Sequence, residues 1–355
     1  MVWRLIIDSG IAGPDSMAPD KSKGQSAEQS VRPATHKPKQ AWHWHPQLPL
    51  TNARIFTWPP ALLTAAKELA SYWFTLTGRV IILLTAIISW FFFKPYLATA
   101  ESFEISWIVQ IYCRNLALLI VFATGLHWYF YTWKGQGEQY RYDSRDMARN
   151  TSMFAFGSQL KDNIFWSIVS GVTIWTLYDI AFMWGYANDL LWAFEWREHP
   201  VWFVAVFVLI PLWYSFYFYW IHRAEHWPPF FKSIHSVHHR NVNVGPWSGL
   251  SMHPVEHILY FGSVLIHLVI PSHPLHVIFH LQFSSLIAVL THCGYDSLVI
   301  RDKRVMGVGY FFHQLHHRYF DCNYGTDEMP WDKWLGTFHD GTPEATARMR
   351  SKKHL

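Results

Sequence analysis

Cysteine is scarce in this sequence. It occurs only as Cys113, Cys293 and Cys322, and no two of these have CxxC spacing. The sequence therefore predicts neither a disulfide framework nor a thiolate metal site. Charged residues make up only 15% of the chain, against roughly 25% in soluble domains. Lys and Arg are spread out and form no basic stripe, which argues against a nucleic-acid partner.

Large apolar residues are nearly absent from residues 14–40, which are rich in Ser, Lys, Pro and Gln. This composition predicts a disordered tail. The first ten residues make no convincing signal peptide, because their apolar run is short and no cleavage context follows it. We treat residues 1–55 as a disordered or loosely docked arm. His43 and His45, which lie beside Trp and Pro, favour docking over metal binding.

Long apolar runs are abundant. Apolar residues make up 51% of the chain and aromatics 18%, and Trp and Tyr collect at membrane interfaces. The mean hydropathy of +0.04 indicates sizeable parts outside the membrane as well. A break at Pro271–Pro274 divides residues 258–290 into halves that are each short for a crossing, which predicts a membrane hairpin. Four other stretches reach the length of about 20 residues that a bilayer requires: 77–98, 107–132, 163–187 and 200–221.

The fold class that this pattern predicts is all-α, a multi-pass membrane helical bundle with four transmembrane helices, a broken hairpin and a cytoplasmic helical cap. Basic residues concentrate in the N-terminal arm and in residues 133–162, whereas the intervening loops are acidic. The positive-inside rule therefore places the region after residue 221 at the cytoplasmic face. The expected organisation is an arm, a transmembrane region, a catalytic domain and a tail, at 1–55, 56–199, 200–340 and 341–355.

Histidine is the most unusual component, with 22 residues that fall mostly between His222 and His317. Three clusters read HRAEH (222–226), HSVHH (235–239) and HQLHH (313–317). Spacings of three and four place imidazoles on one helical face. Burying so many imidazoles without partners would be costly, and metal coordination removes that cost.

The eight imidazoles of these clusters exceed what one ion needs, so the spacing indicates two metals. Imidazole suits zinc, copper, iron and nickel alike, and the donor type does not choose among them. The absence of a thiolate cluster argues against an iron–sulfur centre. Two further motifs, HPVEH (253–257) and HCGYD (292–296), lie between the clusters.

Together these five motifs resemble the fatty acid hydroxylase and sterol desaturase superfamily of membrane-bound di-iron enzymes. HPVEH and HCGYD are most similar to the sterol C-4 methyl oxidase and C-5 desaturase branches. The stretch RYFDCNYGTDEMPWDKWLGTF also resembles the C-terminal signature of that family. The resemblance covers about residues 200–340 and implies two iron ions, with O2 as co-substrate. Zinc can replace iron in a purified form of such a protein.

The resemblance also implies the metal ligands, and no catalytic group beyond them. The residues that match the family's histidine positions are His222, His226, His235, His238, His239, His292, His313, His316 and His317. His253 and Asp296 are candidates for either a ligand or a residue behind the ligands, and His257 for the latter. Ligating histidines usually donate their second N–H to an acceptor, and the candidates for an acidic acceptor are Glu225, Glu256, Asp321 and Asp332. For each of them a solvated or salt-bridged surface acid is the favoured alternative.

The predicted function is that of a membrane oxygenase that hydroxylates or desaturates a lipid: a sterol, a fatty acyl chain or a lipid headgroup. No stretch resembles a fused haem domain, so electrons are expected from a separate reductase, ferredoxin or cytochrome b5-like donor. A bacterial inner membrane is the first expectation for location, and the endoplasmic reticulum the second. Two alternatives are a zinc-dependent membrane hydrolase and a metal-handling membrane protein. Against the first, Glu225 does not directly follow His222, as HExxH would require.

Overall fold

The computed structural model describes residues 41–51, 56, 61–326 and 328–352. The chain divides into two compact units, Met1–Ala41 and Trp42–Leu355, and the second is described below. The predicted tail at 14–40 lies outside the described residues. The longer helices are α1 (Leu62–Phe74), α2 (Gly78–Phe92), α3 (Ile105–His127), α5 (Thr173–Ala187), α6 (Pro200–Glu225), α10 (Pro274–Thr291) and α13 (Pro343–Lys352).

Shorter elements connect these helices. They are the helices α4 (Gln159–Trp166), α7 (Pro228–Phe230), α8 (Ser236–His239), α9 (Pro254–Phe261), α11 (Phe311–Tyr319) and α12 (Trp331–Trp334), and the strands β1 (Ser297–Ile300) and β2 (Lys303–Gly307). The 3-10 turns are Leu97–Glu101, Pro246–Ser248 and Gly262–Leu268, and the π-helical turns are Trp128–Thr132, Ser167–Val172 and Phe231–His235. The fold is mainly helical, as predicted, with a small antiparallel hairpin that the all-α prediction missed.

Among the described residues, four helices are long and apolar enough to cross a membrane. Three of them, Ile105–Thr132, Gln159–Ala187 and Pro200–Glu225, confirm predicted crossings. The predicted crossing at 77–98 is shorter, because α2 ends at Phe92, before Pro95. Helix α2 is long enough to cross a membrane only when it is taken together with α1, from which it is separated by a bend of 43°.

The fourth membrane-length helix is α10, and here the prediction that both halves of the hairpin are short was wrong. His273 caps its N-terminus, Pro274 occupies the first turn, and the helix then runs unbroken for 18 residues. Only the first half is fragmented, into α9 and the turn Gly262–Leu268. Helix α10 is buried around nearly its whole circumference, as expected of a helix enclosed by others.

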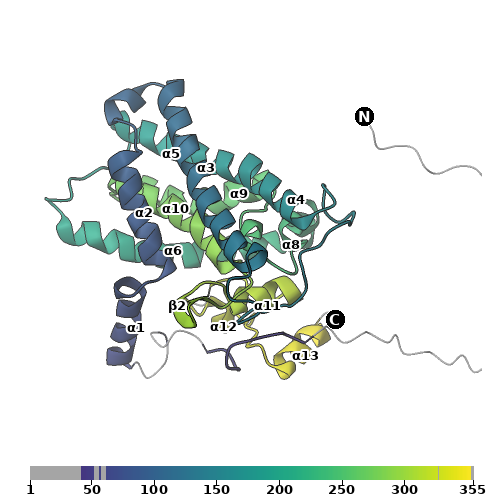
Figure 1. Cartoon of the computed structure of the whole chain (residues 1–355). Helices are drawn as coiled ribbons and strands as arrows, with labels where there is room; N and C mark the ends of the chain where they lie inside the picture. The colour runs from purple at the N-terminus through teal and green to yellow at the C-terminus, as the bar shows by residue number, and fades with distance from the viewer. Residues whose placement is uncertain (1–40, 52–55, 57–60, 327, 353–355) are drawn as a thin grey trace, which may run out of the picture. The chain divides into compact units, whose positions relative to one another are not determined.

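Helix α10 lies at the centre of the bundle, in contact with α2, α3, α5 and α6. Figure 1 shows these helices together, with α11, α12 and β2 gathered at one end of them. The C-terminal ends of α6 and α10 carry His222 and His292. The connectivity therefore delivers several predicted site residues to one end of the bundle.

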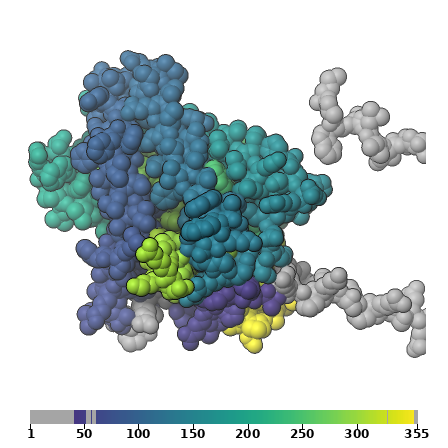
Figure 2. All heavy atoms as spheres, viewed as in Figure 1, coloured from purple at the N-terminus to yellow at the C-terminus, as the bar shows by residue number. Residues whose placement is uncertain are grey.

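Residues 42–50 form an extended arm against this same end. Its even-numbered residues are half-buried and its odd-numbered residues exposed, the alternation of an extended chain on a surface. Trp42 and Leu50 join a cluster with Phe311 and Leu315 of α11, and the Leu50 amide donates to the Asp340 carbonyl at 2.8 Å. In Figure 2 the arm is purple and lies beside the yellow α13.

Candidate metal centre

The last turn of α6 supplies the first imidazoles. The helix ends at Glu225, because Trp227 is followed by two prolines that cannot continue the hydrogen-bond ladder. His222 is almost fully buried, and His226 is the C-terminal cap of the helix. The spacing of four residues and the end of the helix therefore place the two imidazoles one turn apart.

Two short helices and the end of α10 supply the rest. A π-helical turn followed by α8 carries His235, His238 and His239, and α11 carries the HQLHH cluster. His292 caps α10. The chain then turns at Gly294, whose φ is +74°, and an added Cβ there would lie 2.3 Å from the Tyr131 hydroxyl. Glycine is therefore required two positions after this imidazole.

The first group of converging imidazoles holds five of the nine predicted ligands. Its members are His222, His226, His235, His239 and His316, and one ligand atom from each lies within 4.8 Å of all the others. The Nε2 atoms of His226, His239 and His316 form a triangle with sides of 3.0, 3.1 and 3.2 Å. The Nε2 atoms of His222 and His235 are 3.1 Å apart.

The second group holds the other four: His238, His292, His313 and His317. Here too three Nε2 atoms form a triangle, with distances of 3.0, 3.1 and 3.2 Å among His292, His313 and His317. Each group draws its members from more than one sequence cluster. The fold therefore sorts the nine histidines into two sets that their spacing did not reveal.

These triangles are incompatible with hydrogen bonding alone. Each Nε2 atom is either a donor or an acceptor. Of three mutual contacts, at least one must then join two donors or two acceptors. A shared cation removes this conflict. With metal–nitrogen bonds of about 2.0–2.1 Å, neighbouring ligand nitrogens lie about 3.0 Å apart in an octahedron and about 3.4 Å in a tetrahedron. The donor set of each group therefore fits one metal ion.

The opposite ring nitrogens are held by acceptors that direct Nε2 inward. The Nδ1–H groups of His222, His316 and His292 donate to the carbonyls of Tyr324 (2.6 Å), Cys322 (2.6 Å) and Ala288 (2.8 Å). The Nδ1–H group of His235 donates to the Glu256 carboxylate at 2.8 Å. Such contacts fix the tautomer and leave the Nε2 lone pair for a ligand bond.

Burial keeps the imidazoles neutral. The pKa of His292 is lowered to about 4 by desolvation. Burial, followed by repulsion from neighbouring imidazoles, lowers the pKa of six others well below the usual value: His235, His238, His239, His313, His316 and His317. Because only the neutral imidazole binds a metal, these shifts favour coordination at neutral pH.

The three remaining candidates fall outside both groups. His253 is the N-terminal cap of α9, where its Nδ1 accepts from the Val255 amide at 3.2 Å. The His257 ring pairs with the Ser170 hydroxyl at 2.8 Å. Asp296 forms an ion pair with Arg304 and lies 3.3 Å from the Tyr142 hydroxyl. In the described part of the chain these three side chains therefore make other contacts and belong to neither group of imidazoles.

Two acidic candidates do approach an imidazole. Glu225 and Glu256 form a third compact group with His235, and both carboxylates are buried. Asp332 supports His222 indirectly, through the main chain. Its carboxylate accepts from the amides of Tyr324 and Gly325 at 2.9 and 2.8 Å, and so it fixes the loop whose carbonyl orients His222.

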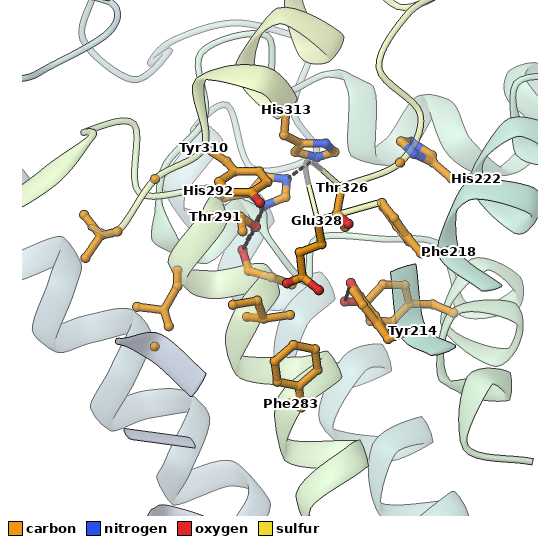
Figure 3. A pocket seen from close by; sticks show the side chains of 18 of the residues that line it. Tyr214, Phe218, His222, Phe283, Thr291, His292, Tyr310, His313, Thr326 and Glu328 are labelled. Atoms are coloured by element: carbon orange, nitrogen blue, oxygen red, sulfur yellow. Dashed lines mark hydrogen bonds between the residues drawn. The ribbon is translucent and has the colours of Figure 1, made fainter. Parts of the chain in front are cut away.

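A cavity of about 260 Å³ opens beside the imidazoles (Figure 3). Its walls are largely apolar and include Phe218, Phe283 and Leu290. Five imidazoles from both groups line it: His222, His235, His238, His292 and His313. Three acidic side chains, Glu225, Glu256 and Glu328, also line it. An apolar molecule in this cavity would lie directly against the candidate metal positions.

Comparison with known proteins agrees with this geometry. Residues 207–337 match the model of the fatty acid hydroxylase family. They belong to that family. All nine predicted ligands, together with Glu225, Glu256 and Glu328, lie inside this fatty acid hydroxylase domain. No solved structure matches the chain.

Relatives of the fatty acid hydroxylase domain carry names from sterol chemistry. The chain is 30% identical over 152 residues to a Delta(7)-sterol 5(6)-desaturase of Aspergillus fumigatus, a match that covers 42% of each chain. It is 29% identical over 158 residues to a Delta(7)-sterol-C5(6)-desaturase of Nicotiana tabacum, covering 43% of this chain and 55% of the relative. It is 31% identical over 150 residues to a methylsterol monooxygenase of Aspergillus fumigatus, covering 39% and 47%. These matches span about half the length of the relatives.

Some site residues escaped sequence reasoning. Glu328 lines the cavity, where it forms an ion pair with Arg79. These two residues are 249 positions apart in the sequence. The carbonyls of Ala288, Cys322 and Tyr324 are main-chain groups and leave no sequence signal. The remaining signal for Glu328 was its place in the C-terminal signature stretch.

Proposed function

We propose that this chain is a membrane-bound di-iron oxygenase that uses O2 and external electrons to hydroxylate or desaturate a lipid. One observation carries the proposal: nine imidazoles, eight of them buried and that of His226 half-buried, converge in two groups beside a largely apolar cavity. The family match and the names of the relatives, which include desaturases and a monooxygenase, support the same chemistry.

The chain's own residues hold and shield the site. Five imidazoles would hold one ion and four the other, with His235 supported by Glu256 and His222 by the Tyr324 carbonyl. When bound, two iron ions supply the activation of O2 that an unactivated C–H bond requires. Phe218, which stacks on His222 with ring centroids 4.8 Å apart, covers this imidazole on the cavity side and limits the access of water.

A lipid is the substrate that the cavity favours. Its walls combine the aromatic rings of Phe218 and Phe283 with aliphatic side chains from α10. Burying apolar surface against such walls is favourable by about 25 cal/mol per Å². The sterol names of the relatives support a sterol-like lipid over a fatty acyl chain or a headgroup.

The site faces the cytoplasm in this proposal. Lys134, Arg141, Arg145 and Arg149 lie in the loop between α3 and α4, at the end of the bundle that carries the imidazoles. The positive-inside rule assigns that end to the cytoplasm, where a separate reductase, ferredoxin or cytochrome b5-like donor would deliver electrons. The fungal and plant relatives favour the endoplasmic reticulum over the bacterial inner membrane that we expected first.

The proposal is tested with full-length protein in nanodiscs. Metal analysis should find about two iron ions per chain after reconstitution, one for each histidine group. Oxygen uptake with reductant and a total lipid extract should depend on the lipid, and mass spectrometry should find a lipid that gains one oxygen atom or loses two hydrogen atoms. The variant His317→Ala should abolish uptake, and Glu344→Gln on the exposed face of α13 should leave it unchanged.

Two other functions remain as outcomes of this test. A protein that retains zinc and stays silent toward O2 after iron reconstitution would be a hydrolase or a metal-handling protein. Lipid hydrolysis without O2 would identify the hydrolase. Reversible metal exchange without any lipid reaction would identify the metal-handling protein.

A further inference from the structure

One acidic side chain in the cavity wall lies outside the two groups of imidazoles. Glu328 lies on the loop before α12, and Figure 3 shows its carboxylate directed into the cavity. One carboxylate oxygen forms an ion pair with Arg79. The other, Oε2, is buried and has no hydrogen-bond partner among the residues that the structure describes. Glu328 belongs to none of the potential metal-binding groups of the described residues.

The position of this carboxylate is fixed by its partner. Arg79 lies in the first turn of α2, immediately after the bend that separates it from α1. Its guanidinium also lies over the Tyr72 ring, 4.2 Å from the centroid. The side chains of Arg79 and Glu328 are only 10% and 13% exposed. The ion pair therefore holds Glu328 in one orientation, with Oε2 toward the cavity.

An unsatisfied buried oxygen is costly. Leaving a buried acceptor without a donor costs about 1–3 kcal/mol, and more for a charged group. Burial also raises the pKa of the Glu328 carboxyl, an effect that Arg79 opposes. A hydrogen-bond donor brought by a bound molecule would remove the cost. The cavity therefore contains an acceptor suited to a ligand.

The charges around the cavity select the kind of donor. Glu225 and Glu256 line the same cavity as Glu328, so a phosphate or carboxylate end would meet three acidic groups. A cationic end would compete with Arg79 for a carboxylate that is already paired. A neutral hydroxyl meets neither obstacle and donates one hydrogen bond. Apart from the imidazoles, Arg79 and several hydroxyl groups, the walls are apolar and suit a carbon skeleton.

We propose that Glu328 binds a neutral hydroxyl group of the lipid substrate through Oε2, while Arg79 holds the carboxylate in place. This inference rests on the proposed function and adds the substrate class: a lipid alcohol whose hydroxyl lies within the same cavity as the reacting carbon. Anchoring the hydroxyl fixes which carbon of the skeleton faces the imidazoles. Glu328 is thus a specificity-determining residue of the site.

The test uses iron-loaded, full-length protein in phosphatidylcholine nanodiscs. The probes are two pairs: a Δ7 sterol and its 3-methyl ether, and a long-chain alcohol and its methyl ether. The ether keeps the skeleton but has no proton to donate. Binding is measured by native mass spectrometry and turnover by product analysis. A hydrogen bond to a charged acceptor contributes about 1.5–3 kcal/mol, so at least one alcohol should bind roughly 10- to 100-fold more tightly than its ether.

The informative variant replaces both members of the pair, Arg79→Met with Glu328→Leu. Removing both charges avoids leaving one buried and unpaired, which protects the fold. Iron content should stay at the wild-type level, while the preference for the alcohol disappears. The control is Glu138→Gln, whose carboxylate pairs with Arg141 at 2.6 Å outside the cavity. It should keep the preference.

The outcomes separate this inference from the function on which it rests. Equal binding of alcohol and ether, binding of neither alcohol, or an undiminished preference in the double variant would each overturn the role of Glu328. Those results leave lipid-dependent O2 uptake with the total extract untouched. Conversely, absence of that uptake overturns the proposed function, while the binding preference still reports on Glu328.

Discussion

The hydrogen bond between His235 and Glu256 gives the sharpest prediction about the metal centre. Of the four Nδ1 contacts described, those of His222, His292 and His316 end at main-chain carbonyls, which substitution cannot remove. Only that of His235 ends at a side chain, at 2.8 Å from a carboxylate oxygen. Glu256→Gln keeps the shape and replaces the charged acceptor with a neutral one.

The expected loss follows from what such contacts contribute. Removing the acceptor behind a ligating histidine typically lowers metal affinity about 10- to 100-fold, which is about 1.4–2.7 kcal/mol. Because the imidazole that Glu256 pairs with is that of His235, the loss should fall on the five-imidazole group. The four-imidazole group, to which His235 does not belong, should bind its ion as before.

The assay is competition with a chelator of known affinity, followed by metal analysis of detergent-purified protein. Wild type and Glu256→Gln should each show two binding steps, with only the step of the five-imidazole group weakened. Glu344→Gln, an exposed acid on α13, serves as the control. Unchanged affinity in both steps, or an equal loss in both, would refute the assignment of Glu256 to one ligand.

Three further predictions concern other parts of the chain. His317→Ala leaves three imidazoles in the smaller group, so metal analysis should show about one ion per chain; His226→Ala leaves four in the larger group and should retain about two. Trp42→Ala removes a ring 3.5 Å from the Arg318 guanidinium and should lower the free energy of unfolding by roughly 2 kcal/mol, whereas the exposed His43→Ala should not. The pKa values of His238, His313 and His317 are lowered by burial, so below their unfolded pKa of about 6.5 only the unfolded chain takes up these protons. The stability of the metal-free protein is thus fully present above that pH and is lost as the pH falls below it, which thermal denaturation between pH 7.5 and pH 5.5 should show.

Local helix geometry is the part of the candidate metal centre that the sequence can predict. Spacings of three and four along a helix bring imidazoles onto one side, and that rule needs no tertiary information. The partition between the two groups is a different matter. His238 and His239 are neighbours in sequence but join different groups, and His316 and His317 do the same. Adjacent side chains on a helix point in different directions, and only the positions of α6, α10 and α11 decide which imidazoles each direction meets.

The membrane segments show the same division. Apolar length was sufficient to place the crossings at 107–132, 163–187 and 200–221, which the structure confirms. It was insufficient for α10, because the break at Pro271–Pro274 makes the remaining run look short. Apolar length also gave no indication that α1 extends the segment formed by α2, because a bend separates the two helices. Long-range pairing of the kind that joins Arg79 to Glu328 leaves no local pattern at all.

The enclosure of α10 has a consequence for biogenesis. Within its most apolar window, 89% of the residues are buried inside the protein, against 28% for Ile105–Thr132 and 33% for Pro200–Glu225. Its polar residues His276, His280 and Gln282 are fully covered by neighbouring helices, and outside that cover they would face lipid without partners. In the folded protein, α3 and α6 leave most of their apolar windows uncovered by protein, whereas α10 is covered on nearly every side. Helix α10 therefore reaches this environment only when the surrounding helices pack against it, and His292 at its C-terminus meets the other imidazoles in the same step.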